Sequence, residues 1–468
     1  MANQKKENHK GQLGLKDNIL WLLVDTVITL KQGKNAIEKR QKKRFTEMVN
    51  YARANSPYYR ELYKHLPVHV EDTKLLPVTN KKELMEHFND FVTDPEATIE
   101  KVQAFVDKPE FIGEYFLDKY TVATTSGTTG KKGIFLIDNR SFKVAGALGF
   151  RTLSSWLSFS DLLRILKGRG RLAMVNAMGG HFASAIAAVR LQKKRSKRFL
   201  VLPVSMPMHE MVEKLNQFQP ILLAPYASMG SLLASEQEAG RLHINPALIV
   251  LSAEGVPERE FVRISEAFKA KVYDSYAATE CPFLSYRCRY GWLHVDSDWV
   301  VVEPVDKDYK PVSPGKQSYT VLISNLANKI QPILRYDLGD SVLQKPEPCE
   351  CGNPLPAIRV QGRSSDVLTF PKDGEKVTIA PLAFSAVAAH ISGIDLFQLV
   401  QTSPTNLRVR LKLSAGAEPE LVWQKVLAEL TGVLKENRLD NITLEQAEEL
   451  PEQTSGGKYR EVIPLKNI

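Results

Sequence analysis

Residues 124–133 read Thr124-Thr125-Ser126-Gly127-Thr128-Thr129-Gly130-Lys131-Lys132-Gly133, a run of glycines, hydroxyl residues and lysines. Apolar segments at 115–122 and 134–137 flank it and predict a strand on either side of a loop. Glycine lets backbone N–H groups turn toward an anion, hydroxyls add donors and lysines add charge, so the loop suits a phosphate. The spacing is not that of a Walker loop. A surface hairpin without a ligand remains the alternative.

Downstream of this loop, short apolar runs alternate with helical periodicity. Helical patterns separate the predicted strands, which lie at 172–177, 199–202, 221–224, 247–252 and 272–273. Such alternation predicts a mostly parallel sheet covered by helices, in which ligands bind beyond the carboxyl ends of the strands. Polar segments follow two predicted strands, at 252–255 and 274–280, and we expect both at the ligand site.

The last hundred residues have a different pattern, with short strands and two helices after the polar break at 362–366. Segments 292–305 and 319–323 alternate with a period of two and predict antiparallel sheet added to the first unit. The predicted fold class is α/β: a large multi-sheet N-terminal domain with βα alternation plus a smaller C-terminal α+β domain. The predicted divisions are 1–38 for a tail and apolar helix, 39–365 for the large domain and 366–468 for a mobile small domain.

Length and composition limit the class of protein. A chain of 468 residues, with 43% hydrophobic and 25% charged residues, is expected to form two or three globular domains. The net charge of +9 suits polyanionic ligands such as nucleotides, but it is not concentrated enough to predict nucleic-acid binding. Four cysteines in this length argue against a disulfide framework and for a reducing, cytoplasmic compartment.

The most apolar stretch, 19–30, is too short to span a membrane and contains Asp25. It lacks a signal-peptide cleavage pattern. Because basic residues follow it from Lys31 to Arg44, a helix lying in a membrane interface is one alternative. A helix docked on its own domain is the preferred prediction.

Five features stand in series along the chain. They are the loop at 124–133, Tyr276-Ala277-Ala278-Thr279-Glu280, Arg335-Tyr336-Asp337-Leu338-Gly339-Asp340, Gly362-Arg363 with Asp366, and Gly456-Gly457-Lys458. The ordered set resembles the adenylate-forming superfamily of acyl-coenzyme A synthetases, peptide-synthetase adenylation domains and luciferases. The segments 55–60 (Asn-Ser-Pro-Tyr-Tyr-Arg) and 348–352 (Pro-Cys-Glu-Cys-Gly) are similar to those of the phenylacetate–coenzyme A ligase branch. The resemblance covers residues from about 40 to 462.

The resemblance implies a two-step reaction. A carboxylate attacks the α-phosphorus of ATP and pyrophosphate leaves; a thiol, usually that of coenzyme A, then attacks the acyl-adenylate. Negative charge develops on phosphoryl oxygens, so the site needs cations and N–H donors aimed there. The implied cofactors are ATP, Mg²⁺ and coenzyme A.

The resemblance also implies roles for particular residues. The pyrophosphate is held by Thr125, Ser126, Gly127, Thr128, Thr129, Gly130 and Lys131, and the nucleotide is also bound by Glu254 and Gly255. Tyr276 stacks on adenine and Thr279 contacts the α-phosphate. Glu280 is a Mg²⁺ ligand, because a hard cation that bridges phosphates is usually coordinated by one or two carboxylates. Asp340 accepts both ribose hydroxyls, and Arg363 reaches the ribose or phosphate.

Two further roles fall near the C-terminus. Lys458 bridges the acyl carboxylate and the phosphate during adenylation, and Asp366 is the hinge about which the small domain rotates. Each implied role has a plainer alternative: a core aromatic for Tyr276, a helix start for Glu280, a turn residue for Asp340 and a loop lysine for Lys458.

Cys288, His294, Cys349 and Cys351 are candidate ligands of a structural Zn²⁺. Three thiolates and one imidazole make a closed tetrahedral set, built here from two short pairs joined by a long segment. Some relatives in the phenylacetate-ligase branch carry a structural zinc on a similar set. Reduced thiols lying in turns by chance are the alternative. Cys281 is left over and is expected to pack near the nucleotide.

The acid pocket is expected among residues 174–184, 224–229 and 253–255, with His181 and Tyr226 as its candidate side chains. His181 could instead only cap a helix. Because these stretches contain no arginine or lysine, an apolar or aromatic monocarboxylic acid fits better than a dicarboxylate. The predicted function is therefore ATP-dependent activation of such an acid and transfer to coenzyme A.

Two alternatives stay open. The adenylate could pass to an amine or to a carrier-protein thiol, or the protein could bind nucleotide without catalysis. The expected partners are the small carboxylic acid and coenzyme A, while a homodimer and peripheral membrane contact are left open.

Overall fold

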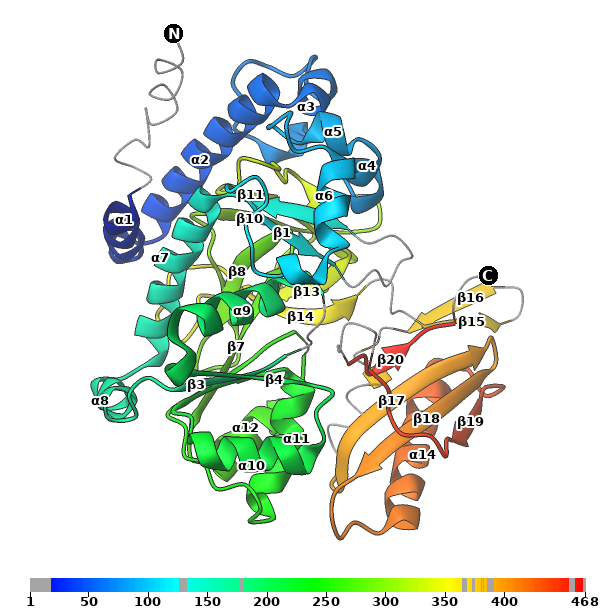
Figure 1. Ribbon diagram of the computed structural model, residues 1–468. Helices are drawn as coiled ribbons and strands as arrows, with labels where there is room; N and C mark the ends of the chain where they lie inside the picture. The colour runs from blue at the N-terminus through cyan, green and yellow to red at the C-terminus, as the bar shows by residue number, and fades with distance from the viewer. Residues whose placement is uncertain are drawn as a thin grey trace.

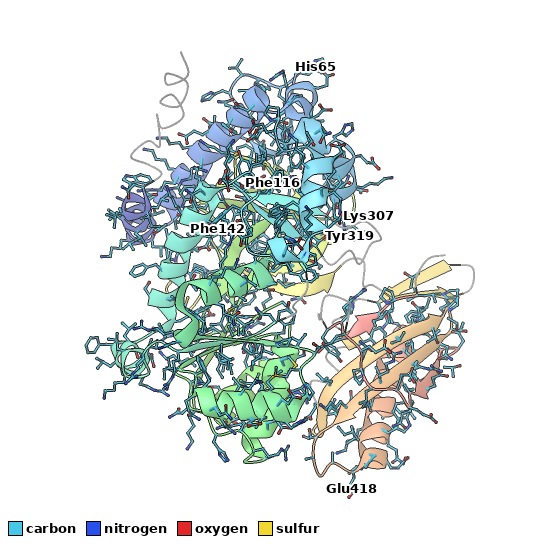
Figure 2. All side chains as sticks on the ribbon, viewed as in Figure 1. His65, Phe116, Phe142, Lys307, Tyr319 and Glu418 are labelled. Carbon is cyan, nitrogen blue, oxygen red and sulfur yellow. The ribbon has the colours of Figure 1, made fainter. Side chains whose placement is uncertain are left out.

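The computed structural model describes residues 18–125, 133–176, 180–253, 255–256, 258–363, 368–372, 375–379, 381, 383–384, 391–453 and 459–465. A large N-terminal part fills the upper and left side of Figure 1, and a smaller C-terminal part lies at its lower right. Figure 2 labels His65 and Glu418 at opposite ends of the molecule. The mixed α/β class, with a multi-sheet large part and an α+β C-terminal part, is as the sequence predicts.

Six helices come first in the chain. They are α1 (Ile19–Gln32), α2 (Lys34–Asn55), α3 (Pro57–Leu62), α4 (Lys81–Glu86), α5 (Phe88–Phe91) and α6 (Ile99–Val106). The side chain of Asn18 caps the start of α1, and Gly33, at φ +79°, ends it and lets the chain turn into α2. Ser56 caps α3, where Pro57 occupies the first turn. The helix over 19–32 is docked on α2 and on α7 (Asn139–Trp156), as preferred from the sequence.

A nine-stranded sheet forms the centre of the large part. Its spatial order is β13-β14-β9-β8-β7-β6-β5-β3-β4. The strands are β3 (Leu172–Asn176), β4 (Phe199–Pro203), β5 (Leu222–Pro225), β6 (Leu248–Leu251), β7 (Lys271–Ala278), β8 (Cys281–Arg287), β9 (Leu293–Val295), β13 (Asp340–Gln344) and β14 (Ala357–Arg363). Strands β4 to β7 of this order are parallel, while β7 to β13 pair antiparallel. The predicted parallel sheet is confirmed.

The strand around 272–273 is longer than the sequence predicts. β7 continues to Ala278, because residues 271–274 pair with β6 and residues 275–278 pair with β8. Tyr276 therefore lies inside a strand, and the expectation that all of 274–280 follows the strand is wrong. The segment 292–305, predicted to add antiparallel sheet, does so in two pieces, since β9 and β10 (Val300–Val305) belong to different sheets.

The remaining sheets of the large part are small. β1 (Thr121–Thr124) and β2 (Ile134–Ile137) form an antiparallel hairpin. β10 (Val300–Val305), β11 (Thr320–Asn325) and β12 (Tyr336–Asp337) form a three-stranded antiparallel sheet. The helices after β2 are α7 (Asn139–Trp156), α8 (Phe159–Lys167), α9 (Ala183–Arg195), α10 (Met208–Phe218), α11 (Ala227–Glu238) and α12 (Glu258–Phe268).

The C-terminal part has its own apolar core. β15 (Leu368–Lys372) and β16 (Glu375–Ile379) form a hairpin. β17 (Ile394–Ser403), β18 (Asn406–Leu413), β19 (Thr443–Gln446) and β20 (Val462–Ile463) form a four-stranded sheet against α14 (Pro419–Glu436). The predicted division at 365/366 falls at residues outside the described ranges and stays a prediction. Among the helices that the structure describes, none combines the length and apolar character needed to cross a bilayer.

Candidate functional site

The hairpin β1–β2 carries the glycine-rich loop, and the base of that loop is closed by two hydrogen bonds. The N–H of Thr125 donates to the carbonyl of Gly133 at 3.0 Å, and the N–H of Gly133 donates to the Thr125 hydroxyl at 2.9 Å. A Cβ at Gly133 would lie 2.7 Å from the Phe135 ring, so only glycine fits there. Ser126, Gly127, Thr128, Thr129, Gly130 and Lys131 lie outside the described residues.

Three buried amide side chains, one at the end of β11 and two between β11 and β12, tie this hairpin to the next part of the site. Gln331 accepts from the Leu136 N–H at 2.6 Å, and Asn328 donates to the Leu136 carbonyl at 2.8 Å. Asn325 donates to the Glu280 carbonyl at 3.0 Å. One segment therefore holds both the loop's second strand and Glu280. The sequence prediction missed these amides, because an amide in a connecting segment ordinarily faces water.

Tyr276 and Asp340 meet although they lie on different strands. The Tyr276 hydroxyl donates to Asp340 Oδ2 at 2.6 Å. Asp340 begins β13 directly after Gly339, which has φ +78°, and its Cα partner on β14 is Arg363. The Tyr276 ring is half-buried against the main core of the large part. The structure thus brings together the three residues predicted for adenine and ribose, although the Arg363 side chain is not among those described.

Thr279 and Glu280 form the two-residue turn between β7 and β8, where Ala278 pairs with Cys281. The alternative of a helix start at Glu280 is therefore wrong. Glu280 is 8% exposed, and its Oε1 accepts a hydrogen bond from the Tyr336 hydroxyl at 2.9 Å. Tyr336 orients this carboxylate and was not assigned a role from the sequence, although it lies within the segment 335–340.

Arg335 and Asp337, in the same segment 335–340, make contacts that hold the fold together. Arg335, at φ +46°, donates to the Leu76 carbonyl at 2.6 Å and lies 3.7 Å from Glu303. Asp337 accepts from the Thr320 hydroxyl at 2.6 Å and from the Gly339 N–H at 3.0 Å. These contacts fix the turn that presents Asp340.

The strand order creates a switch point beside the predicted acid pocket. β3 lies between β4, which follows it in sequence, and β5, so the carboxyl ends of β3 and β5 border the crevice where doubly wound sheets bind ligands. Tyr226 follows β5, and its hydroxyl lies 3.3 Å from that of Ser184 at the start of α9. Tyr226 is 1% exposed. The two hydroxyls therefore lie together in the segments that follow β3 and β5.

His181 lies in the connection from β3 to α9. Its carbonyl accepts from the Thr124 N–H at 2.7 Å, which joins this connection to the end of β1. Its ring packs 5.5 Å from the Phe105 ring and lies 3.5 Å from the Lys108 carbonyl. Burial lowers the pKa of His181, so the imidazole is neutral at pH 7. α9 begins at Ala183, two residues later.

On the small part, Gln398 clamps both ends of the loop that carries Lys458. It donates to the Glu452 carbonyl at 2.9 Å and to the Arg460 carbonyl at 3.0 Å. Gln453 and Tyr459 pair as an isolated bridge across the loop base. Lys458 itself lies outside the described residues, as do Glu254 and Asp366. Gly255 is described and lies before α12, with open space around its Cα.

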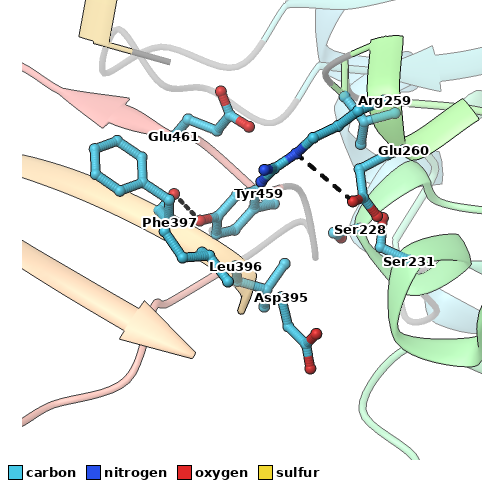
Figure 3. A pocket seen from close by; sticks show the side chains of 11 residues that line it. Ser228, Ser231, Arg259, Glu260, Asp395, Leu396, Phe397, Tyr459 and Glu461 are labelled. Atoms are coloured by element: carbon cyan, nitrogen blue, oxygen red, sulfur yellow. Dashed lines mark hydrogen bonds and ion pairs between the residues drawn. The ribbon is translucent and has the colours of Figure 1, made fainter. Parts of the chain in front are cut away.

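Figure 3 shows where the small part meets helices α11 and α12. A cavity of about 30 Å³ lies between Ser228, Ser231, Arg259 and Glu260 on the large part and Asp395 and Tyr459 on the small part. Arg259 donates to the Ile391 carbonyl at 2.7 Å, and Ser235 lies 3.4 Å from Asp395. Tyr459, the residue that follows Lys458 in the sequence, therefore lies at the interface between the two parts.

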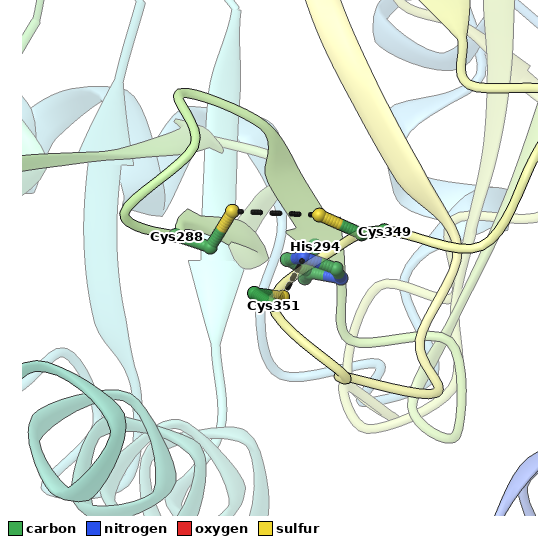
Figure 4. A group of neighbouring side chains, drawn as sticks. All are labelled: Cys288, His294, Cys349 and Cys351. Carbon is green, nitrogen blue, oxygen red and sulfur yellow. Dashed lines mark hydrogen bonds between the residues drawn. The ribbon is translucent and has the colours of Figure 1, made fainter.

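A second cluster gathers the three cysteines and the histidine predicted to bind metal (Figure 4). Candidate ligand atoms of Cys288, His294, Cys349 and Cys351 all lie within 4.8 Å of one another. Cys288 and Cys349 sulfurs are 3.7 Å apart, and Cys351 Sγ is 3.2 Å from His294 Nε2. Zinc–sulfur distances of about 2.3 Å make a tetrahedron with sulfur–sulfur edges of about 3.8 Å. The donor set and its spacing therefore fit Zn²⁺.

Contacts behind this cluster fix its ligands. His294 is fully buried, and its Nδ1–H donates to the Leu355 carbonyl at 2.9 Å, which leaves the Nε2 lone pair facing the sulfurs. Burial raises the pKa of Cys349 to about 12. Cys281 is fully buried in the core and lies outside the cluster.

Comparisons with known proteins agree with this architecture, although no family model matches the sequence. Protein CapK of Staphylococcus aureus is 24% identical over 482 residues, which cover 97% of this chain and 95% of CapK. The crystal structure of 2-hydroxyisobutyryl-CoA ligase in the postadenylation state superposes with a TM-score of 0.66 at 21% identity, over 98% of this chain and 94% of that chain.

The same ligase in its thioesterification state, in complex with 2-HIB-AMP and CoA, gives a TM-score of 0.54 at 19% identity. That match covers 91% of this chain and 89% of the ligase. The chain therefore shares the fold of 2-hydroxyisobutyryl-CoA ligase.

Proposed function

We propose that this protein is an AMP-forming acid–thiol ligase. It activates an apolar or aromatic carboxylic acid with ATP, releases pyrophosphate and transfers the acyl group to a thiol, that of coenzyme A. The observation that carries the proposal is the meeting of segments 276–280 and 335–340 through the Tyr276–Asp340 and Glu280–Tyr336 hydrogen bonds. The shared amide segment joins this pair to the glycine-rich hairpin, which supports a single nucleotide site.

Each residue has a role that follows from its chemistry. Asp340 accepts from the ribose hydroxyls, and the Tyr276 ring supplies an apolar face for adenine. Thr279 and the loop at 125–131 donate hydrogen bonds to phosphoryl oxygens, and Arg363 adds positive charge. Glu254 and Gly255 are also proposed to bind the nucleotide. Glu280, oriented by Tyr336, is the proposed ligand for Mg²⁺, which neutralises phosphate charge when bound.

The remaining roles belong to the moving part and to the acid pocket. Lys458 brings an ammonium to the reacting carboxylate and phosphate, and Asp366 is the proposed hinge. Tyr226 and His181 border the acid at the switch point. A neutral imidazole and a phenol suit an apolar acid, because neither adds a cation to hold a second carboxylate.

Within the superfamily we place the chain in the phenylacetate–coenzyme A ligase-like branch. The segment 55–60, in which Ser56 caps α3, and the Cys/His cluster support this placement. The cluster is proposed to hold a structural Zn²⁺, which when bound joins the β8–β9 turn to the β13–β14 connection.

The test is acid-dependent exchange of pyrophosphate into ATP, run over a panel of aryl and fatty acids, with AMP release in the presence of coenzyme A. Lys458→Ala should abolish exchange, while Lys435→Ala, an exposed lysine on α14 of the same part, should leave it unchanged. Nucleotide binding without exchange across the whole panel would contradict the proposal and favour a non-catalytic protein. The acceptor in the second step is identified by comparing the rate of acyl transfer to coenzyme A with the rates to a pantetheinyl carrier and to amines.

A further inference from the structure

Helix α1 packs with its polar side inward. The buried residues are Leu22, Asp25, Thr26 and Thr29. Asp25 pairs with Arg44 and with Arg40, the latter at 2.9 Å, and Thr29 donates to the Asp25 carbonyl at 2.5 Å. The opposite side, at spacing i, i+4 and i+8, holds Leu20, Val24 and Ile28, which are 68%, 56% and 41% exposed. Because the buried side of α1 is held by the ion pairs of Asp25, the apolar residues on its opposite side face outward.

Helices α7 and α8 extend this exposed apolar surface. Ile19 of α1 lies against α7, since a Cβ at Gly146 would be 3.9 Å from its Cδ1. One and two turns beyond Gly146, Phe150 and Leu153 are 54% and 43% exposed. α8 follows α7 after two residues, and its Phe159 and Leu166 are 76% and 73% exposed. In Figure 1, α1, α7 and α8 all lie along the left edge of the molecule.

We call the exposed apolar side chains of α1, α8 and the second half of α7 the apolar helix face. In addition to the residues above, it includes Trp21, Leu162 and Leu163. It holds eleven of the twenty-two exposed large hydrophobic side chains in the described part of the chain. Single exposed apolar residues are ordinary, but here α1 packs on α7, and α8 follows α7 directly in the chain. Such a gathering of exposed apolar side chains indicates a surface that binds a partner.

Charge indicates what covers it. Segments 19–34 and 139–171 contain two carboxylates, Asp25 and Asp161, and both are buried and paired. Their exposed charges are basic: Lys31, Lys34, Lys167 and Arg169, of which Lys34 lies 3.9 Å from Glu38 of α2. A second copy of this chain, docked face to face, would set these like charges against each other. We call these four basic residues the basic rim. An anionic lipid surface complements both the basic rim and the apolar side chains.

We propose that the apolar helix face docks this protein on an anionic bilayer. α1 has 14 residues and is about 21 Å long, so it lies in the interface rather than crossing the hydrocarbon core of about 30 Å. Docking through the apolar helix face does not depend on which acid is activated, and it would hold the protein at the membrane surface.

The test is flotation of the full-length protein with vesicles of phosphatidylcholine alone, or with phosphatidylglycerol as about one third of the lipid. The face variant carries Leu20→Gln, Val24→Gln, Phe159→Gln and Leu166→Gln. The matched control carries Val68→Gln, Leu421→Gln and Leu450→Gln, whose native side chains are 83%, 53% and 62% exposed. We expect wild type and control to float with the anionic vesicles, and the face variant to float at least about tenfold less.

A second variant, Lys31→Glu with Lys34→Glu and Lys167→Glu, tests the rim and should lose flotation on anionic vesicles. Circular dichroism and thermal melting check that each variant is folded. The proposal is overturned if wild type does not float, if the face variant floats like the control, or if the rim variant binds like wild type. It is also overturned if the face variant instead abolishes a concentration-dependent dimer in sedimentation without lipid.

Discussion

The phenol of Tyr276 donates a 2.6 Å hydrogen bond to the carboxylate of Asp340, 64 residues later in the chain. The bond joins β7 at the centre of the nine-stranded sheet to β13 at its edge. Because the ring is also half-buried, the contact fixes both the carboxylate and the face that is proposed to stack on adenine.

The two functions of Tyr276 can be separated by substitution. Tyr276→Ala removes ring and hydroxyl, and we expect the KM for ATP to rise about 10- to 100-fold, the value of one base–aromatic stack. Tyr276→Phe keeps the ring and should raise this KM only a few fold. The measurement is pyrophosphate exchange at varied ATP. Equal effects of the two substitutions would mean that the hydroxyl contact with Asp340, and not stacking, is what matters.

Glu280 is expected to act through Mg²⁺. Glu280→Gln removes the charge and should lower the exchange rate about 100-fold or more. Tyr336→Phe removes only the 2.9 Å hydrogen bond that orients this carboxylate, so it should raise the Mg²⁺ concentration needed for half-maximal rate with little change in the rate at saturation. The measurement is exchange over a Mg²⁺ titration. An unchanged Mg²⁺ requirement in both variants would remove Glu280 from the metal site.

Loss of the Cys/His cluster should remove zinc and lower stability. We expect about one zinc per chain in the wild type, and less than about half in His294→Ala and Cys349→Ser, because ligand loss opens a closed site. Cys281→Ala, which changes a buried cysteine outside the cluster, should keep its zinc. Elemental analysis and thermal melting with and without chelator are the measurements. A wild-type protein purified gently with little zinc would count against the site.

Asp161 should make stability fall in acid. Burial raises the pKa of Asp161, but the hydrogen bonds from Lys271 and Ser158 outweigh it and lower the pKa to about 2. A carboxyl whose folded pKa is depressed stabilises the fold above its unfolded pKa of about 3.9, and this contribution is lost as pH falls toward 2. Asp161→Asn should cost about 1–2 kcal/mol at pH 7 and flatten the decline between pH about 4 and about 2. Urea unfolding curves for the two proteins that run parallel over that range would contradict this.

The buried pair of Asp25 and Arg44 should hold α1 in place. Asp25→Ala removes the nearer of the two carboxylates that face the buried Arg44 guanidinium and leaves Asp298, at 3.5 Å, as its remaining anionic partner, so we expect the free energy of unfolding to fall by about 3 kcal/mol. Val24→Ala, one residue away on the exposed side, should change it by less than about 0.5 kcal/mol. Urea denaturation measures both. Similar costs for the two substitutions would show that the ion pair does not anchor the helix.

Much of the fold follows from local patterns. Alternating apolar runs and helical periodicity predict the parallel half of the central sheet, and the period of two predicts the antiparallel additions. The polar turns at 279–280 and 338–340 could be located for the same reason, since they interrupt apolar runs. The length of β7 could not be predicted in this way. Its second half is stabilised by pairing with β8, and a local sequence pattern does not show which strands will pair.

The sequence by itself determined the alternation of strands and helices and the four candidate metal ligands, because these depend on residue types at fixed spacing. Only the tertiary structure decided that Tyr336 orients Glu280, that Asn325, Asn328 and Gln331 join two parts of the site, and that α1 turns its apolar side outward. Each of these depends on which strands and helices become neighbours. That choice is made by the packing of the whole core and by buried pairs such as Asp25–Arg44, which connect residues that no local periodicity relates.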